Sequence, residues 1–366
     1  MAQPSQSTHS LTHVQHATFA QLANAGHKIT TINEKTAAFE AAHNTTRPLP
    51  QNWKGAQQSI IPQVATLAQA KLFHDGSVLL PDGLYAYHDA TFNIEPWRSR
   101  HNRSVMRYID EHCDDAFIQP HRKSVAIEGR CFSTLSNTTH NYGHFIHDVL
   151  SRIYYEDLGL LTPEREKIIA PQFKFPMQRY LFETIFSQYE IIEAPLGTYM
   201  EVEKLVLPAN LCSSTCFNAN GIAALATRMR KAFTSYTGGT PRKVCVSRKD
   251  GKDTGGRAFT NVDAYEQMMR KEGYEVVEVS RMDIQTQLTL WANTTDLVGI
   301  HGAGMMNMIM MPEGSRYTEI TGAVRGPFYT ARCAIAAGHN VAGITEPLDA
   351  KGAAQINTTA LRELLE

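Results

Sequence analysis

Residues 296–311 read Asp-Leu-Val-Gly-Ile-His-Gly-Ala-Gly-Met-Met-Asn-Met-Ile-Met-Met, an apolar run that meets a glycine turn and then a second apolar run. The pattern predicts a strand over 297–300 and a helix over 305–311. The backbone amides of Gly302, Ala303 and Gly304 could approach an anion closely there, and the start of the helix adds unpaired N–H groups. A tight turn without a ligand is the alternative. The position of His301 favours a site, because open α/β sheets bind ligands at the carboxyl ends of strands.

The regions on both sides of this stretch continue the alternation of strand and helix. After Pro241 the pattern predicts strands over 243–247, 274–279, 297–300 and 316–320, with helices over 262–272, 284–293 and 305–311 between them. A less regular alternation covers residues 77–233, and Gly238-Gly239 followed by Pro241 is typical of a domain boundary. We therefore predict an α/β fold of two facing Rossmann-like domains, 66–238 and 239–366, with a cleft between them. Residues 1–65 are expected to form a polar, partly helical N-terminal extension.

Composition narrows the class of protein. The 366 residues include 35 basic and 36 acidic side chains, a balance that argues against a nucleic-acid partner. The six cysteines show no zinc-binding spacing and are expected to be reduced thiols. The N-terminal residues lack the pattern of a secretory signal, and no apolar run is long enough to span a bilayer. These features predict a soluble, cytoplasmic protein without a membrane span.

The first chemical motif is Asn141-Tyr-Gly-His-Phe-Ile-His-Asp148, at the start of an expected helix. Residues three and four apart share a helix face, so His144, His147 and Asp148 can converge. One interpretation makes Asp148 a general base oriented by the histidines, with His144 in reserve. A second is a metal site, and a third is a purely structural helix start in which Asn141 is the cap and His144 lies in the core. We favour the base, which would deprotonate a hydroxyl group.

The second motif, Ser247-Arg-Lys-Asp-Gly-Lys252 followed by Arg257 and Asn261, comes after the first strand of the second domain. Arg248, Lys252 and Arg257 suit a diphosphate, because the guanidinium group pairs well with phosphate oxygens. A solvated charged loop is the alternative. The acid Glu319 ends the strand over 316–320, where it could bind ribose hydroxyls. The chain contains no Asp-x-Asp pair, the usual metal ligand of many nucleotide-sugar enzymes.

Together these motifs resemble glycosyltransferase family 61, and in particular a bacterial-type member. The residues that carry the resemblance follow the order of the family pattern: Asn141, His144, Phe145 and Asp148; Ser247, Arg248, Arg257 and Asn261; His301, Gly302, Ala303 and Gly304; Asn307; and Glu319. The resemblance implies a GT-B fold with an acceptor-side domain at 66–238 and a donor-binding domain at 239–366. It also implies that Asn261, the 301–304 turn, Asn307 and Glu319 bind the donor together with the three cations.

The resemblance further implies inverting transfer of a sugar from a nucleotide-sugar, commonly UDP-linked, to an acceptor hydroxyl in glycan or polysaccharide biosynthesis. No cofactor and no metal are expected. The partners are then a nucleotide-sugar donor and a glycan, lipid-linked or small-molecule acceptor. Two alternatives stay open: a metal-dependent hydrolase at His144, His147 and Asp148, and a non-catalytic sugar-nucleotide-binding protein.

Overall fold

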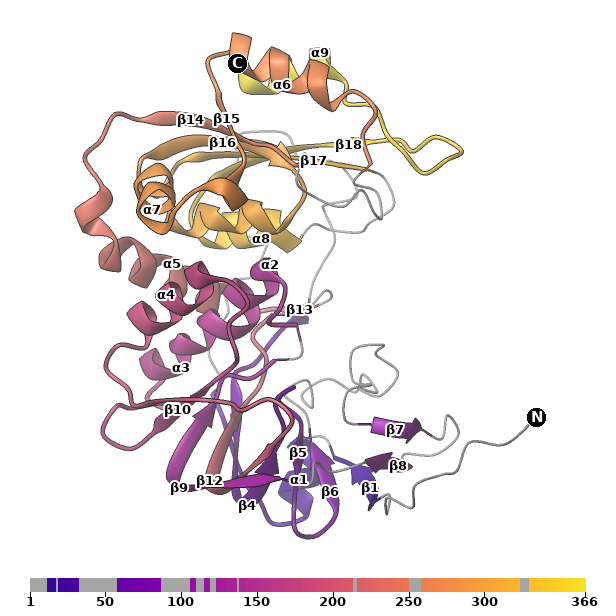
Figure 1. Cartoon of the computed structure of the whole chain (residues 1–366), viewed down its shortest axis with the longest axis vertical. Helices are drawn as coiled ribbons and strands as arrows, with labels where there is room; N and C mark the ends of the chain where they lie inside the picture. The colour runs from indigo at the N-terminus through magenta and orange to yellow at the C-terminus, as the bar shows by residue number, and fades with distance from the viewer. Residues whose placement is uncertain are drawn as a thin grey trace.

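The computed structural model describes residues 12–17, 19–32, 58–86, 106–109, 115–118, 123–136, 138–212, 216–249, 258–322 and 329–366. These residues form two large β-sheets with helices packed against them (Figure 1). A two-stranded pair, β3 (Gln58–Ser59) with β13 (Cys216–Phe217), accompanies them. None of the helices in the described part of the chain is long and apolar enough to cross a membrane. The cytoplasmic location stays a prediction.

The first sheet is mixed and contains eleven strands within the described residues. In spatial order they are β11 (Ile191–Glu193), β10 (Lys167–Ala170), β9 (Ser124–Ser133), β12 (Tyr199–Pro208), β4 (Gln63–Leu72), β5 (Val78–Leu79), β6 (Leu84–Ala86), β1 (Thr12–His16), β8 (Asp115–Ile118) and β7 (Met106–Ile109), with β2 (Lys28–Thr31) also paired to β4. The four strands β11, β10, β9 and β12 are parallel to one another, and β4 runs antiparallel to β12. Strand order reverses between β9 and β12, which is where open sheets bind ligands.

The N-terminal part of the chain joins this sheet where it is described. Strand β1 pairs with β6 and β8, and β2 pairs with β4. Strand β4 runs across residue 65, where the sequence predicts the end of a separate extension. Only α1 (Phe19–Asn24) is helical among the described residues before residue 65. The local composition is polar, but pairing with distant strands satisfies the backbone groups and buries Ala65 and Leu67.

The second sheet is parallel throughout, as the alternation of strands and helices predicts. Its strands lie in the order β15 (Glu275–Val277), β14 (Arg242–Val246), β16 (Thr294–Ile300), β17 (Arg316–Gly322) and β18 (Asn340–Glu346). The chain leaves β14 to form β15 on one side and β16 to β18 on the other. The strand order therefore reverses between β14 and β16, and the loops after these two strands carry Arg248 and His301.

Helices cover both faces of the second sheet (Figure 1). On one face lie α6 (Val262–Lys271) and α9 (Thr358–Leu365), and on the other, toward the first sheet, lie α7 (Ile284–Ala292) and α8 (Tyr329–Ala336). The remaining helical segments are α2 (Tyr142–His144), η4 (Phe145–Val149), η5 (Leu150–Ile153), α3 (Tyr154–Asp157), α4 (Pro176–Ile185), α5 (Ala219–Ala232), η6 (Thr234–Tyr236), η7 (Val279–Arg281) and η8 (Ala303–Met310).

The two halves share a hydrophobic core. Helix α5 packs against η8 and α8. Its buried side chains Leu225 and Met229 belong to the same cluster as Met306 and Ile309 of η8. Each fully buried side chain of this kind contributes roughly 1.5–3 kcal/mol to stability. The segment 237–241 connects α5 and η6 to β14, and the predicted division at 238/239 falls in this connection and stays a prediction.

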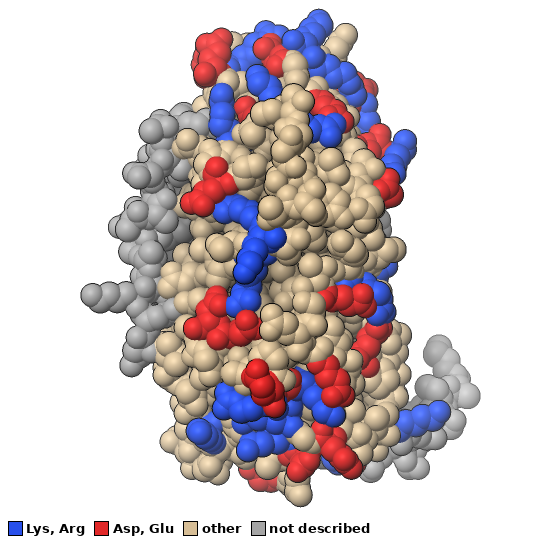
Figure 2. All heavy atoms as spheres, turned by 90° about the vertical axis from the view of Figure 1, so that its left-hand side faces the viewer, with Lys and Arg blue, Asp and Glu red and all other residues tan. Residues whose placement is uncertain are grey.

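The surface mixes charges of both signs. On the face shown in Figure 2, lysine and arginine side chains lie beside aspartate and glutamate side chains. Ion pairs among the described residues include Arg228 with Glu156 at 3.0 Å and Arg179 with Glu193 at 2.6 Å. This mixing is in keeping with the net charge of −1.

Candidate active site

The helix that carries the first motif begins at Asn141 and then changes its winding. The Oδ1 atom of Asn141 accepts hydrogen bonds from the amides of Gly143 (2.9 Å) and His144 (3.4 Å), so the predicted cap is present. The next segment, η4, is π-helical, and the amide of Leu150 reaches back to the carbonyl of Phe145. The hydroxyl of Ser151 donates to the carbonyl of His147 at 2.5 Å, a side-chain bond that competes with regular α-helical bonding. The sequence predicts one regular helix here, whereas the structure widens it at the site.

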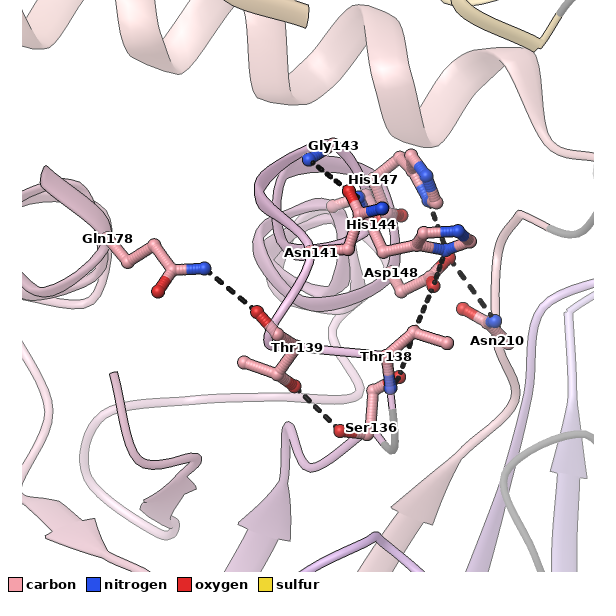
Figure 3. A network of polar contacts seen from close by, with 11 residues as sticks. Ser136, Thr138, Thr139, Asn141, Gly143, His144, His147, Asp148, Gln178 and Asn210 are labelled. Atoms are coloured by element: carbon pink, nitrogen blue, oxygen red, sulfur yellow. Dashed lines mark hydrogen bonds and ion pairs between the residues drawn. The ribbon is translucent and has the colours of Figure 1, made fainter. Parts of the chain in front are cut away.

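Four side chains converge on the carboxylate of Asp148 (Figure 3). His144 Nδ1 lies 2.9 Å from Oδ2, and His147 Nδ1 lies 2.5 Å from Oδ1. Thr138 Oγ1 donates to Oδ2 at 2.9 Å, and Asn210 Nδ2 lies 3.5 Å from Oδ1. Thr138 follows β9 and Asn210 follows β12, the two strands between which the order reverses. The site therefore occupies the position where an open sheet binds a ligand.

The two histidines and Asp148 differ in their exposure to solvent. The side chains of His147 and Asp148 are buried, whereas that of His144 is 43 % exposed. Burial lowers the pKa of His147 to about 4, so this imidazole is neutral at neutral pH. Burial acts to raise the pKa of Asp148, but the attraction and hydrogen bonds of the two histidines outweigh it and hold this pKa well below its usual value. An ionised Asp148 thus holds the Nδ1–H of an accessible His144.

The same three residues could offer ligands to a metal ion. One ligand atom from each of His144, His147 and Asp148 lies within 4.8 Å of the others. Histidine nitrogens and carboxylate oxygens suit zinc, and catalytic zinc sites use three protein ligands. Among the described residues no fourth histidine, cysteine, aspartate or glutamate joins this group.

Arg248 lies across the glycine turn of the second half. Its Nη1 atom donates to the carbonyl of His301 at 2.7 Å. A Cβ atom at Gly302 would lie only 2.0 Å from this Nη1, so the close approach of the guanidinium requires a glycine. The backbone of Gly302 is extended, with φ of 176°, so space and not conformation restricts this position. The turn predicted from the sequence is present, but the helix after it, η8, is a 3₁₀ helix.

Helix α6 holds the residues on both sides of Arg248. The hydroxyl of Ser247 donates to Glu266 Oε1 at 2.6 Å, and Lys249 Nζ lies 3.1 Å from Glu266 Oε2. Glu266 is buried, and a buried carboxylate needs such partners: Lys249 supplies the opposite charge and Ser247 a hydrogen bond. Lys252 and Arg257, both predicted to bind phosphate, lie outside the described residues.

His301 is oriented by a fully buried acid. Its Nδ1 contacts Glu319 Oε1, which also accepts a hydrogen bond from Thr330 Oγ1 at 2.6 Å. The second oxygen of Glu319 accepts from the hydroxyl of Tyr317 at 2.8 Å. The sequence places Glu319 at the end of its strand facing a ribose. The structure places it in the middle of β17, where both oxygens bond protein side chains.

The two asparagines predicted to bind the donor also bond protein groups. Asn261 exchanges two hydrogen bonds of 2.9 Å with the backbone of Ile356. Asn307 is fully buried, and its Nδ2 donates to the carbonyl of Gly304 at 3.0 Å.

The two halves of the site meet through α2 and η8. The hydroxyl of Tyr142 donates to Asn307 Oδ1 at 2.6 Å. A Cβ atom at Gly143 would lie 3.5 Å from the Cα atom of Ala303, so the two backbones are in contact range. The first residue of α8, Tyr329, places its ring centroid 3.9 Å from that of His147. The histidine and acid motif of the first half therefore lies beside the glycine turn of the second.

A comparison with known protein families gives a match that includes most residues of this site. Residues 142–318 match the family model described as Glycosyltransferase 61. This part of the chain belongs to glycosyltransferase family 61. Membership implies that it is a transferase that moves a sugar from a donor to an acceptor. The matched segment begins at Tyr142 and ends one residue before Glu319. No match is found among curated proteins.

Several residues of this candidate site are absent from the sequence-based prediction. They are Thr138, Tyr142, Asn210, Glu266, Tyr329 and Thr330, all of which contact a predicted site residue. Thr138 lies three residues before the first motif and Tyr142 lies within it, so the sequence shows that both are near the site. Asn210 and the two residues of α8 come close only through the fold, and no local pattern marks them.

Proposed function

We propose that the protein is an inverting, metal-independent glycosyltransferase of GT-B-like architecture that transfers a sugar from a nucleotide-sugar, UDP-linked in the simplest case, to an acceptor hydroxyl in glycan or polysaccharide biosynthesis. The observation that carries the proposal is the accessible imidazole of His144. It is held at Nδ1 by the buried Asp148, and its helix packs against a glycine turn crossed by Arg248.

The geometry supports His144 as the general base, with Asp148 as its orienting partner. The sequence suggests the reverse order, with Asp148 as the base. The carboxylate of Asp148 is nearly enclosed, and its lowered pKa makes it a weak proton acceptor. When Nδ1 of His144 donates to Asp148, Nε2 is the ring nitrogen that carries the lone pair and would take the proton. Replacing the base should then leave donor binding intact.

The transfer is a single displacement. The acceptor oxygen attacks the anomeric carbon from the face opposite the nucleotide, and its proton passes to Nε2 of His144. The bond between the anomeric carbon and the diphosphate oxygen breaks, and its electron pair remains on the diphosphate. One displacement inverts the configuration at the anomeric carbon.

Arg248, His301 and the amides of 302–304 are proposed to bind the departing diphosphate, and Lys252 and Arg257 to assist from the same loop. Fixed donors of this kind stabilise charge as it develops. Because Asn261, Asn307 and Glu319 bond protein groups, we assign them to support of this site and not to direct donor contact.

Nucleotide binding tests the donor site. Calorimetry with UDP, GDP, CMP and ADP, with and without EDTA, should show one preferred nucleotide whose affinity does not depend on the chelator. Arg248→Ala should weaken this binding at least tenfold, because an arginine–phosphate pair contributes about 1.5–3 kcal/mol. Arg179→Ala is the matched control, since Arg179 pairs with Glu183 and Glu193 on α4 and β11.

Turnover separates the proposal from its alternatives. With water as the acceptor, proton NMR of the freshly released sugar should show the anomer opposite to that of the donor. Binding of no nucleotide would remove the donor site. Activity that requires an added metal would favour the hydrolase built on His144, His147 and Asp148, and binding with no transfer to any acceptor would favour a sugar-nucleotide-binding protein.

A further inference from the structure

One side chain of the base helix reaches into the second half of the molecule. Tyr142 lies two residues before His144 in the capped first turn of α2, and its hydroxyl donates to Asn307 Oδ1 at 2.6 Å. Burial raises the pKa of Tyr142 well above its usual value, so the hydroxyl keeps its proton. Tyr142 and His144 belong to the same short helical turn. A movement of the Tyr142 side chain would therefore displace the turn that carries His144.

Asn307 bonds the glycine turn with the other end of its amide. Its Nδ2 donates to the carbonyl of Gly304 at 3.0 Å, and its side chain is fully buried. A carbonyl can only accept, so it fixes Nδ2 on its own side and leaves Oδ1 for Tyr142. One amide thus joins the last residue of the glycine turn to the first residue of the base helix.

The contact is supported by close backbone packing. Gly143 lies between Tyr142 and His144, and a Cβ atom there would be 3.6 Å from the Cβ atom of Ala303. The base helix and the turn therefore touch at the point where the hydrogen bond joins them. The two halves are therefore closely packed at this point.

We propose that Tyr142 and Asn307 are positioning residues that set the distance between His144 and the donor bound at the glycine turn. The inference rests on the proposed function, because it assumes a donor at the turn and a base on α2. Its consequence is kinetic: a displacement of about 1 Å between reacting groups can cost on the order of 10²-fold in rate.

Tyr142→Phe removes only the hydroxyl and is the direct test. We expect kcat to fall by about 10- to 100-fold, while the UDP dissociation constant stays within about twofold of wild type. Tyr274→Phe is the matched control, since the Tyr274 hydroxyl is buried and donates to Asp296 at 2.8 Å near the amino end of β16. That control should lower the unfolding temperature to a similar extent and leave kcat unchanged.

A double-variant cycle keeps the test independent of folding losses. Asn307→Ala alone should slow transfer, and adding Tyr142→Phe to it should slow transfer no further, because residues in one network are not additive. Additive losses would overturn the shared role. A Tyr142→Phe enzyme with the kcat of the Tyr274→Phe control would overturn it as well.

Hydrogen exchange gives a readout that does not depend on an acceptor. UDP should slow exchange in a peptide covering 303–310, and in the wild type the protection should extend to a peptide covering 142–149. In Tyr142→Phe only the first peptide should be protected. Equal protection of both peptides in the variant would remove the positioning role alone, whereas a wild-type protein that binds no nucleotide would remove the proposed function and this inference with it.

Discussion

The Nδ1 atom of His144 lies 2.9 Å from Oδ2 of Asp148, four residues further along the chain. The acid is buried and the imidazole is partly exposed, and the helix that carries both residues packs against the segment of the glycine turn. Such a pairing fixes the tautomer and orientation of the ring.

Removal of the imidazole should abolish transfer and leave donor binding intact. His144→Ala is expected to lower turnover by about 10²- to 10⁴-fold, the usual contribution of a general base. Because the ring is partly exposed, added imidazole should enter the vacated space and restore part of the rate. Rescue of Asp148→Ala by formate, with no imidazole rescue of His144→Ala, would return the role of base to Asp148.

A methyl group at Gly302 should displace Arg248. The new Cβ atom would lie 2.0 Å from Nη1, so Gly302→Ala must break the hydrogen bond to the carbonyl of His301. UDP affinity, measured by calorimetry, should fall about tenfold or more. Gly304→Ala should cost less, since its Cβ atom would meet Val246 at 3.4 Å. Equal losses in the two variants would show that Arg248 does not contribute to nucleotide binding.

Glu319→Gln should distinguish an orienting acid from a ribose ligand. If Glu319 acts through His301, as its buried contacts indicate, the variant should bind UDP and 2′-deoxy-UDP more weakly by the same factor. If Glu319 bonds the ribose, the preference of the wild type for UDP should shrink in the variant. Calorimetry with both nucleotides on both proteins makes the comparison.

Stability should fall as the pH drops below about 6.5, because two buried histidines stay neutral in the folded state. Burial lowers the pKa of His147 and of His339 to about 4 from an ordinary value of 6.5, so the unfolded chain binds more protons in this window. Each group should cost about 2 kcal/mol between pH 7 and pH 5. The loss should be nearly complete at pH 4.

His339→Gln isolates one of these contributions. His339 Nε2 lies 2.8 Å from the carbonyl of Met308, a bond that the glutamine amide can replace. Urea unfolding at pH 7 and pH 5 should show a pH dependence that is smaller by about 2 kcal/mol in the variant. An unchanged difference between the two pH values would show that His339 is already neutral in the unfolded state or charged in the fold.

The order of strands and helices in the second half could be predicted because the sequence signals for both kinds of element are local. Apolar runs of strand length and glycine turns follow from side-chain type, and strands that alternate with helices favour parallel pairing. In the first sheet, the alternation predicted over residues 77–233 agrees with the parallel strands β9 to β12. The antiparallel part of that sheet pairs segments far apart in the chain, including β1 with β8, and no local pattern specifies such partners.

The sequence by itself determined which residues could carry the chemistry: a histidine and acid motif, a cationic loop, and a glycine turn after an apolar strand. It also determined the family, because the order of these motifs along the chain is itself a sequence property. Only the tertiary structure decided their roles. In the fold, Asp148 and Glu319 are buried and His144 is accessible. The packing of α2 on η8 brings the hydroxyl of Tyr142 to Asn307. Exposure and contact between distant segments depend on the whole fold, so side-chain type alone cannot specify them.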